Sequence, residues 1–229
     1  MCEVINIFDI KATVEKEVYD NLDTSITLDT SGLVIELNSK VVELPFVSFL
    51  DKTIGNIPDL YGSETFIRFD SLSKRLIYFI YAENIDSVSL FKIKEPSKFL
   101  RGNLCFRKNI SNTFSWKECL ISDETEEIFF CRNLRFKEVK FSKLLINSNF
   151  SFILLNGIVE GIVIDLRTFY LEKWNVYEFN FIKNYLKLIS KENWLKNEEE
   201  QNLKEINTLM RNYKGNIFSK DINKLLEYS

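Results

Sequence analysis

The most hydrophobic stretch of the chain runs from Ser151 to Leu166 and reads SFILLNGIVEGIVIDL. A membrane-spanning helix needs about 20 mostly apolar residues, whereas this run is shorter and is interrupted by Asn156, Glu160 and Asp165. Asn156 followed by Gly157 is the strongest short-range signal for a β-hairpin, because a type I′ turn needs positive φ at both central residues. The stretch therefore predicts a hairpin of two strands and no membrane segment.

A two-residue loop also fixes the register of this hairpin, because each residue of one strand then has a set partner on the other. The register places Ile153 opposite Glu160 and Phe152 opposite Gly161, where an aromatic ring covers the bare glycine backbone. Apolar residues follow on both faces of the second strand, which is typical of an interior strand of a sheet. Glu160 is then expected on an apolar face.

A buried carboxylate must find a partner or stay protonated, which makes Glu160 the buried acid of most interest. It can act as a general acid or a metal ligand with a raised pKa, or it can pair with a lysine or arginine on a neighbouring strand. A single acid is enough for neither a catalytic site nor a metal site. We therefore assign no catalytic residue, no metal ligand and no cofactor.

Short apolar segments alternate with turn signals over residues 1–177, without helical periodicity. Hairpins are expected in TSITLDTSGLVIEL, which turns between Asp29 and Gly32, and in ETFIRFDSLSKRLIYFIYAE, which turns between Ser71 and Lys74. Further strands are expected in VSLFKIK, NLCFRKN, EIFFCRN, LRFKEVKF and DLRTFYLEKW. Neighbouring strands joined by short turns pair in antiparallel fashion.

From about Glu178 onward the apolar residues recur at helical spacing. Two stripes mark two helices: Phe179, Ile182, Leu186 and Ile189, then Leu203, Ile206, Leu209, Met210 and Tyr213. Asn197 can cap the second helix, with Glu200 closing a capping box, and Gly215 can end it. The sequence thus predicts one α+β domain over residues 1–229. Its expected parts are a mainly antiparallel β-sheet meander over residues 1–177 and a packed helical C-terminal segment over residues 178–229.

The chain contains no histidine, and this absence excludes several chemistries. The chain therefore cannot use histidine to activate a nucleophile, to act as a general base or to bind a metal. The glycines form no phosphate-binding loop, and no cysteine pair has zinc-site spacing. The net charge of −3 provides no global attraction to nucleic acid or to anionic lipid. We expect a cytoplasmic protein, and an enzyme is not the favoured interpretation.

A nucleic-acid-binding protein or a metal-dependent nuclease-like enzyme is the alternative, and it would use the basic strands around residues 92–143. A restriction-type nuclease needs an acid on one strand and Glu-x-Lys on the next, for which Asp123 and the segment from Glu138 to Lys140 qualify. Phenylalanines between the basic residues could stack on single-stranded bases: Phe91, Phe99, Phe106, Phe136 and Phe141. Lysine-rich strand faces are more often simply solvated.

The sequence SDETEE, from Ser122 to Glu127, separates two expected strands and is called the acidic segment below. Its simplest structure is a solvated hairpin tip. Carboxylates clustered on a rigid β scaffold can also occupy the basic cleft of a partner and steer its association. The candidate partner-binding residues are therefore Asp123, Glu124, Glu126 and Glu127.

With no catalytic constellation, the sequence favours a non-enzymatic protein-binding module. An inhibitor or immunity-type protein that neutralises a nuclease or another toxin fits a small, acidic, histidine-free chain. The expected partner is thus another protein, with nucleic acid second and no membrane.

Overall fold

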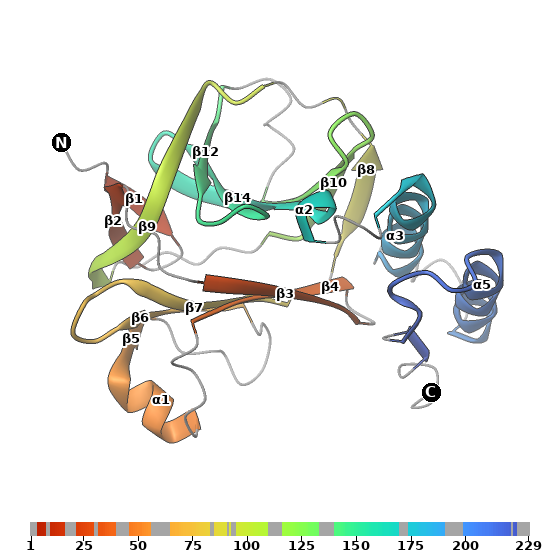
Figure 1. The fold of residues 1–229 in the computed structure, drawn as a ribbon, viewed down its shortest axis with the longest axis horizontal. Coiled ribbons are helices and arrows are strands. Elements are labelled where there is room, and N and C mark those ends of the chain that lie inside the picture. Colours follow the sequence, from red (N-terminus) through yellow and green to blue (C-terminus); the bar gives the residue numbers. More distant parts are fainter. Residues whose placement is uncertain are drawn as a thin grey trace.

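The computed structural model is an α+β structure made mostly of strands. It describes residues 4–7, 10–16, 22–29, 32–39, 46–55, 65–82, 85–90, 92, 95–109, 116–132, 140–169, 174–190, 199–220 and 222–223. Two sheets lie on each other, and the helices near the C-terminus stand at one end of them (Figure 1). The α+β class expected from the sequence is confirmed.

The larger sheet, sheet A, has the strand order β1-β2-β9-β12-β13-β14-β11-β10-β8. Its strands are β1 Val4–Ile7, β2 Ile10–Lys16, β8 Ser87–Leu90, β9 Lys98–Asn109, β10 Glu118–Ser122, β11 Glu127–Cys131, β12 Ser142–Leu145, β13 Phe150–Leu155 and β14 Ile158–Asp165. β1 also pairs in parallel with β14, where Asn6 lies opposite Ile158. This contact closes six strands, from β1 through β14, into a ring, and β11, β10 and β8 extend from β14.

Most strand pairs of sheet A are antiparallel, as expected, but the sheet is more than a meander. It is closed, and it contains three parallel pairs: β8 with β10, β9 with β12, and β1 with β14. Short turn signals reveal only pairs of strands that follow each other in sequence. Parallel pairs need long connections and leave no such signal.

The smaller sheet, sheet B, is antiparallel and has the order β3-β4-β7-β6-β5. Its strands are β3 Leu22–Asp29, β4 Gly32–Ser39, β5 Thr53–Gly55, β6 Phe66–Asp70 and β7 Leu76–Tyr81, and helix α1, Phe46–Lys52, leads into β5. Both hairpins expected here are confirmed. The turn from β6 to β7 is held by the Asp70 carboxylate, which accepts the backbone N–H groups of Leu72 and Ser73.

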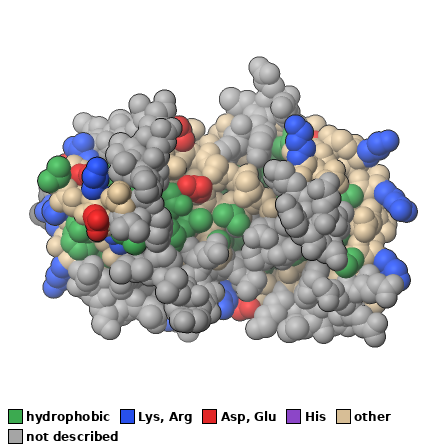
Figure 2. Space-filling view, turned by 90° about the horizontal axis from the view of Figure 1, so that it is seen from below, with side chains coloured by type: hydrophobic (Ala, Val, Ile, Leu, Met, Phe, Trp, Pro, Cys, Tyr) green, Lys and Arg blue, Asp and Glu red, His purple; other side chains and the backbone are tan. Residues whose placement is uncertain are grey.

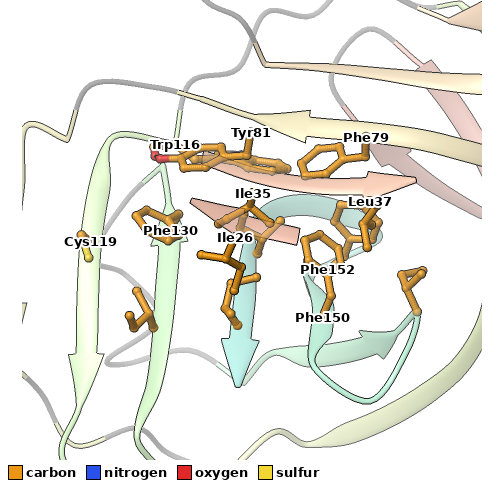
Figure 3. Packing of buried hydrophobic residues seen from close by; sticks show 14 of the residues in the cluster. Ile26, Ile35, Leu37, Phe79, Tyr81, Trp116, Cys119, Phe130, Phe150 and Phe152 are labelled. Carbon is orange, nitrogen blue, oxygen red and sulfur yellow. The ribbon is translucent and has the colours of Figure 1, made fainter. Parts of the chain in front are cut away.

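The main core lies between the two sheets, where aromatic rings of β7 meet rings of sheet A (Figure 3). Phe79 contacts Phe150 and Phe152, with ring centroids 5.5 and 5.4 Å away. Tyr81 packs against Phe130 at 4.8 Å, and its hydroxyl donates to the carbonyl oxygen of Trp116. A second, smaller cluster lies on the opposite face of sheet A and contains Leu120, Phe129, Cys131, Phe141, Ile153 and Val163. The strands in the middle of sheet A are thus buried on both faces.

The hairpin of β13 and β14 forms as expected, with φ of 52° at Asn156 and 77° at Gly157. The expected register holds only next to the turn. Beyond Leu154 a β-bulge adds one residue to β14, so Ile153 pairs with Gly161 and Phe152 pairs with Ile162. The predicted pairs of Ile153 with Glu160 and of Phe152 with Gly161 are therefore wrong. An inserted residue shifts every later pair by one position.

The segment DLRTFYLEKW was expected to be a strand, but helix α2 spans Leu166–Phe169. The Asp165 carboxylate accepts the backbone N–H of Arg167, and the Thr168 hydroxyl donates to the Asp165 carbonyl. These local bonds give the backbone an alternative to the sheet ladder. The strand β14 consequently ends at Asp165.

The predicted C-terminal helices are present. Helix α3 spans Val176–Ile189 and buries its whole expected stripe, and Asn175 caps it by accepting the N–H groups of Tyr177 and Glu178. Helix α5 spans Glu199–Asn212 and packs on α3, and Gly215, with φ of 82°, follows it. The proposed cap Asn197 lies outside the described residues. In the described part of the chain, no helix combines the length and the apolarity that crossing a membrane requires.

Candidate functional site: the acidic segment

The acidic segment forms the tight turn between β10 and β11. Ser122 holds the turn from its first strand: its carbonyl accepts the N–H of Glu126 at 2.9 Å, and its hydroxyl accepts the N–H of Thr125 at 3.2 Å. Glu126 has a positive φ of 54°, as residues at the end of such turns often do. The hairpin tip expected from the sequence is thus present.

The side chain of Glu127 lies beside the smaller apolar cluster of sheet A, which contains Phe129. Its carboxylate lies 2.6 Å from the ammonium of Lys143 on β12, and the Thr125 hydroxyl donates to it at 3.1 Å. Only 9% of the Lys143 side chain and 15% of the Glu127 side chain are exposed. Lys143 also lies 5.2 Å from the ring centre of Phe129. The pair is therefore a largely desolvated ion pair beside an apolar cluster, and removing either partner should be costly.

Glu126 is bound by the residue that precedes helix α3 by two positions. The indole N–H of Trp174 donates to the Glu126 carboxylate at 2.6 Å. The Trp174 ring packs against Phe179, whose side chain is buried in the core. Glu126 thereby ties the turn to the start of α3.

Asp123 and Glu124 occupy the exposed side of the turn. The Asp123 carboxylate lies 3.0 Å from the ammonium of Lys183 on α3, and the Glu124 carboxylate lies 2.8 Å from that of Lys92. The two acidic side chains are 53% and 59% exposed, respectively. Glu124 raises the pKa of Lys92 by accepting its hydrogen bond. The pair of Glu124 and Lys92 is exposed at both ends and contributes little to stability. In the pair of Asp123 and Lys183, by contrast, the lysine side chain is only 17% exposed.

The four candidate acids therefore divide into two pairs with different surroundings. Glu126 and Glu127 are bound within the fold and position the turn, whereas Asp123 and Glu124 present charge to solvent. Their contacts come from β12, from α3 and the tryptophan just before it, and from Lys92, which follows β8. Nothing in the local sequence indicated which lysine or tryptophan would reach the turn, because the partners lie far along the chain.

Glu160 is the extra residue of the bulge in β14, and its side chain is half-buried. Burial raises the pKa of its carboxyl above the ordinary value, and the positive charge of Arg132 partly offsets this effect. Arg132 also donates its backbone N–H to the Glu160 carbonyl oxygen at 3.1 Å. Glu160 is thus an acid that lies at the β-bulge of β14, near an arginine.

Glu160→Gln is expected to stabilise the protein slightly at pH 7, by less than about 1 kcal/mol, because solvent screens a half-buried group. The folded state holds the proton more tightly than the unfolded state does. Deprotonation of Glu160 therefore costs stability as the pH rises from the ordinary carboxyl pKa through the folded value. Below that window the carboxyl is protonated in both states. Urea unfolding at pH 7 and pH 3.5 measures the effect, and an equal difference at both pH values would contradict it.

The residues proposed for the alternative functions are only partly brought together. Of the five candidate stacking rings, Phe91 and Phe136 lie outside the described residues. Phe141 is buried, Phe106 packs on Phe69, and Phe99 is largely exposed. Glu138 lies outside the described residues, and the Asp123 carboxylate is bound to Lys183. Within the described ranges, no three acidic or cysteine side chains are placed to hold a metal ion.

The acidic segment is thus a braced turn with two exposed carboxylates at its tip. Cys105, Cys119 and Cys131 are free thiols, and burial raises the pKa of the Cys119 thiol well above its ordinary value.

Comparison of the chain with protein-family models, with curated proteins and with solved structures found no match. Its function is therefore inferred from its own residues alone.

Proposed function

We propose that the protein is a non-enzymatic, cytoplasmic protein-binding module. It binds a basic surface of another protein and masks it, as an inhibitor or an immunity-type protein masks a nuclease or another toxin. The observation that carries this proposal is the acidic segment, in which two internally bound acids brace a turn that exposes two further acids. The free thiols are consistent with a reducing compartment.

Bracing matters because ordering a loop on binding costs conformational entropy. The acidic segment is already fixed to β12 through Glu127 and to Trp174, just before α3, through Glu126, so Asp123 and Glu124 lose little freedom when a partner docks. Carboxylates presented in this way raise the rate of encounter with a basic partner and disfavour acidic ones. The geometry suits recognition of a protein by charge.

The rings of the basic region favour a protein partner over nucleic acid. The face seen from below belongs to the sheet B side, where the described lysine and arginine side chains lie mostly toward the two ends of the molecule (Figure 2). The basic strands belong to sheet A, on the far side from this view (Figure 1). A nucleic-acid backbone needs a continuous basic track, and strong binding of single strands needs several exposed rings. Among the candidate stacking rings that the structure describes, only Phe99 is widely exposed.

Affinity capture from the native lysate tests the proposal with three immobilised proteins. The parent is compared with Asp123→Asn/Glu124→Gln and with Asp23→Asn/Asp51→Asn, a control that removes two exposed acids elsewhere. We expect the same protein to be retained by the parent and the control after nuclease treatment, and to be lost from the variant of the acidic segment. Retention that depends on nucleic acid, or equal retention by all three, would contradict the proposal.

A further inference from the structure

Two lysines lie directly opposite each other where β2 pairs with β9 in sheet A. Lys11 on β2 is the register partner of Lys108 on β9. Cross-strand partners have their Cβ atoms about 5 Å apart, and like charges in such positions destabilise the sheet. In the described part of the chain, no carboxylate forms an ion pair with either lysine. The fold therefore keeps two positive charges together without neutralising them.

A β-bulge brings a third cation to the same place. The register of β2 and β9 shifts after Lys11, which makes Arg107 the extra residue beside Lys108. The Arg107 Nε donates to the hydroxyl oxygen of Thr13 at 3.0 Å. Lys11 and Thr13 are two residues apart on β2, so they lie on one face. Consecutive side chains of a regular strand point to opposite faces, but at the bulge Arg107 and Lys108 both reach the face of Lys11.

These three cations, Lys11, Arg107 and Lys108, are called the basic cluster below, and they face away from the core. The residues on either side of Lys11, Ile10 and Ala12, are fully buried in the main core. Lys11 therefore lies on the opposite, outer face of the sheet. Arg107 and Lys108 are exposed. A ligand can thus reach the basic cluster from solvent.

The two strands that carry the basic cluster contain a single acid, Glu15. It lies on the same face of β2 as Lys11, four residues or about 13 Å further along. Its carboxylate already accepts a hydrogen bond from the Arg75 guanidinium at 2.9 Å. Neither strand therefore offers a counter-charge to the basic cluster, and an anion from solution would supply one.

We propose that the basic cluster binds a phosphate group in the form of a phosphomonoester dianion. Arginine presents a planar fork that matches phosphate, and lysine adds a compact charge. The bond to Thr13 orients the arginine before the ligand arrives. Two negative charges on one small group suit three cations on one face better than the single charge of a phosphodiester does.

This site is separate from the acidic segment and goes beyond the proposed function. β2 and β9 lie at the opposite end of the molecule from α3, which contacts the acidic segment (Figure 1). The ligand that the basic cluster binds is thus independent of the protein partner. A failure at the basic cluster would leave the proposed function standing, and the reverse also holds.

Phosphomonoesters occur on soluble molecules and on lipid headgroups, and two probes separate these sources. Phenyl phosphate is the soluble probe, and phenyl sulfate, a monoanion of similar shape, is its control. Phosphatidylcholine vesicles that contain phosphatidic acid present the same group on a lipid. At pH 8 we expect phenyl phosphate to bind about tenfold more tightly than phenyl sulfate. The net charge of −3 disfavours an anionic vesicle, so we expect the soluble source.

Arg107→Gln/Lys108→Gln should bind phenyl phosphate about tenfold more weakly than the parent, because two charged hydrogen bonds are lost. It should resist urea at least as well as the parent, since it removes the opposed lysine charges. Lys117→Gln/Arg211→Gln removes one lysine and one arginine charge from exposed positions elsewhere and should bind like the parent. Nuclear magnetic resonance titration gives the three dissociation constants.

Binding of phosphatidic acid vesicles alone, lost in Arg107→Gln/Lys108→Gln, would assign the phosphate group to a lipid. Equal weakening by both double variants would show a general effect of charge and overturn the inference. A parent that binds neither probe, or that binds phenyl sulfate as tightly as phenyl phosphate, would overturn it as well.

Discussion

Gly161→Ala is expected to lower the free energy of unfolding by about 3 kcal/mol, at the upper end of what overpacking costs. Gly161 lies on β14 between β11 and β13, where it pairs with Cys131 and Ile153. A Cβ atom at this position would stand 2.3 Å from the carbonyl oxygen of Phe130 and 3.0 Å from the Cα of Cys131. The neighbour is sheet backbone inside the core and cannot turn away as a flexible side chain would.

Gly215→Ala is the control for Gly161→Ala. Gly215 has φ of 82°, but apart from its chain neighbours no atom of the described residues lies within 4 Å of the position of its Cβ. Its replacement should therefore cost only the strain of a left-handed residue, about 1 kcal/mol. Urea unfolding of both variants measures the difference. If both variants lost the same free energy of unfolding, the close approach of β11 would not be the reason why position 161 needs a glycine.

The second large effect concerns the ion pair of Glu127 and Lys143. Glu127→Leu leaves the Lys143 ammonium largely buried without its carboxylate, and Lys143→Met leaves the carboxylate without its ammonium. Each change should lower the free energy of unfolding by about 3 kcal/mol, whereas the double variant should come within about 1 kcal/mol of the parent. A double-mutant cycle from urea unfolding gives the coupling.

The exposed pair provides the comparison for this cycle. Glu124→Leu and Lys92→Met remove an ion pair whose side chains are 59% and 80% exposed, so both variants should unfold at nearly the same denaturant concentration as the parent. Additive losses at Glu127 and Lys143 would contradict the structural role of the inner acids. A large loss at Glu124 would contradict its availability to a partner.

Elements defined by neighbouring residues could be predicted from the sequence. The Asn156–Gly157 turn, the hairpin of β3 and β4, and the buried stripe of α3 all depend on local signals, and all are present. The bulge at Glu160 could not be predicted in this way. It depends on how β14 fits between two strands, and the turn sets the register only for the first pairs beside it.

The closure of sheet A and the bracing of the acidic segment could not be predicted from the sequence either, because both depend on contacts between segments that lie apart. β1 meets β14 across most of the chain, and Glu127 on β11 meets Lys143 on β12, although β13 and β14 lie between these two strands in sheet A. Charge alone identified the four acids but gave all of them one role. Their division into inner and exposed pairs depends on contacts with β12 and α3, which only the folded arrangement provides.

The most direct test of this division is the association rate with the captured partner, measured against ionic strength. For the parent, the rate should fall as salt rises, because salt screens exposed charges over about 10 Å at 0.1 M. Asp123→Asn/Glu124→Gln should fold normally, associate more slowly at low salt and depend less on salt. The rates of the two proteins should then converge at high salt. Parallel salt curves with equal rates would remove the exposed acids from recognition and contradict the account.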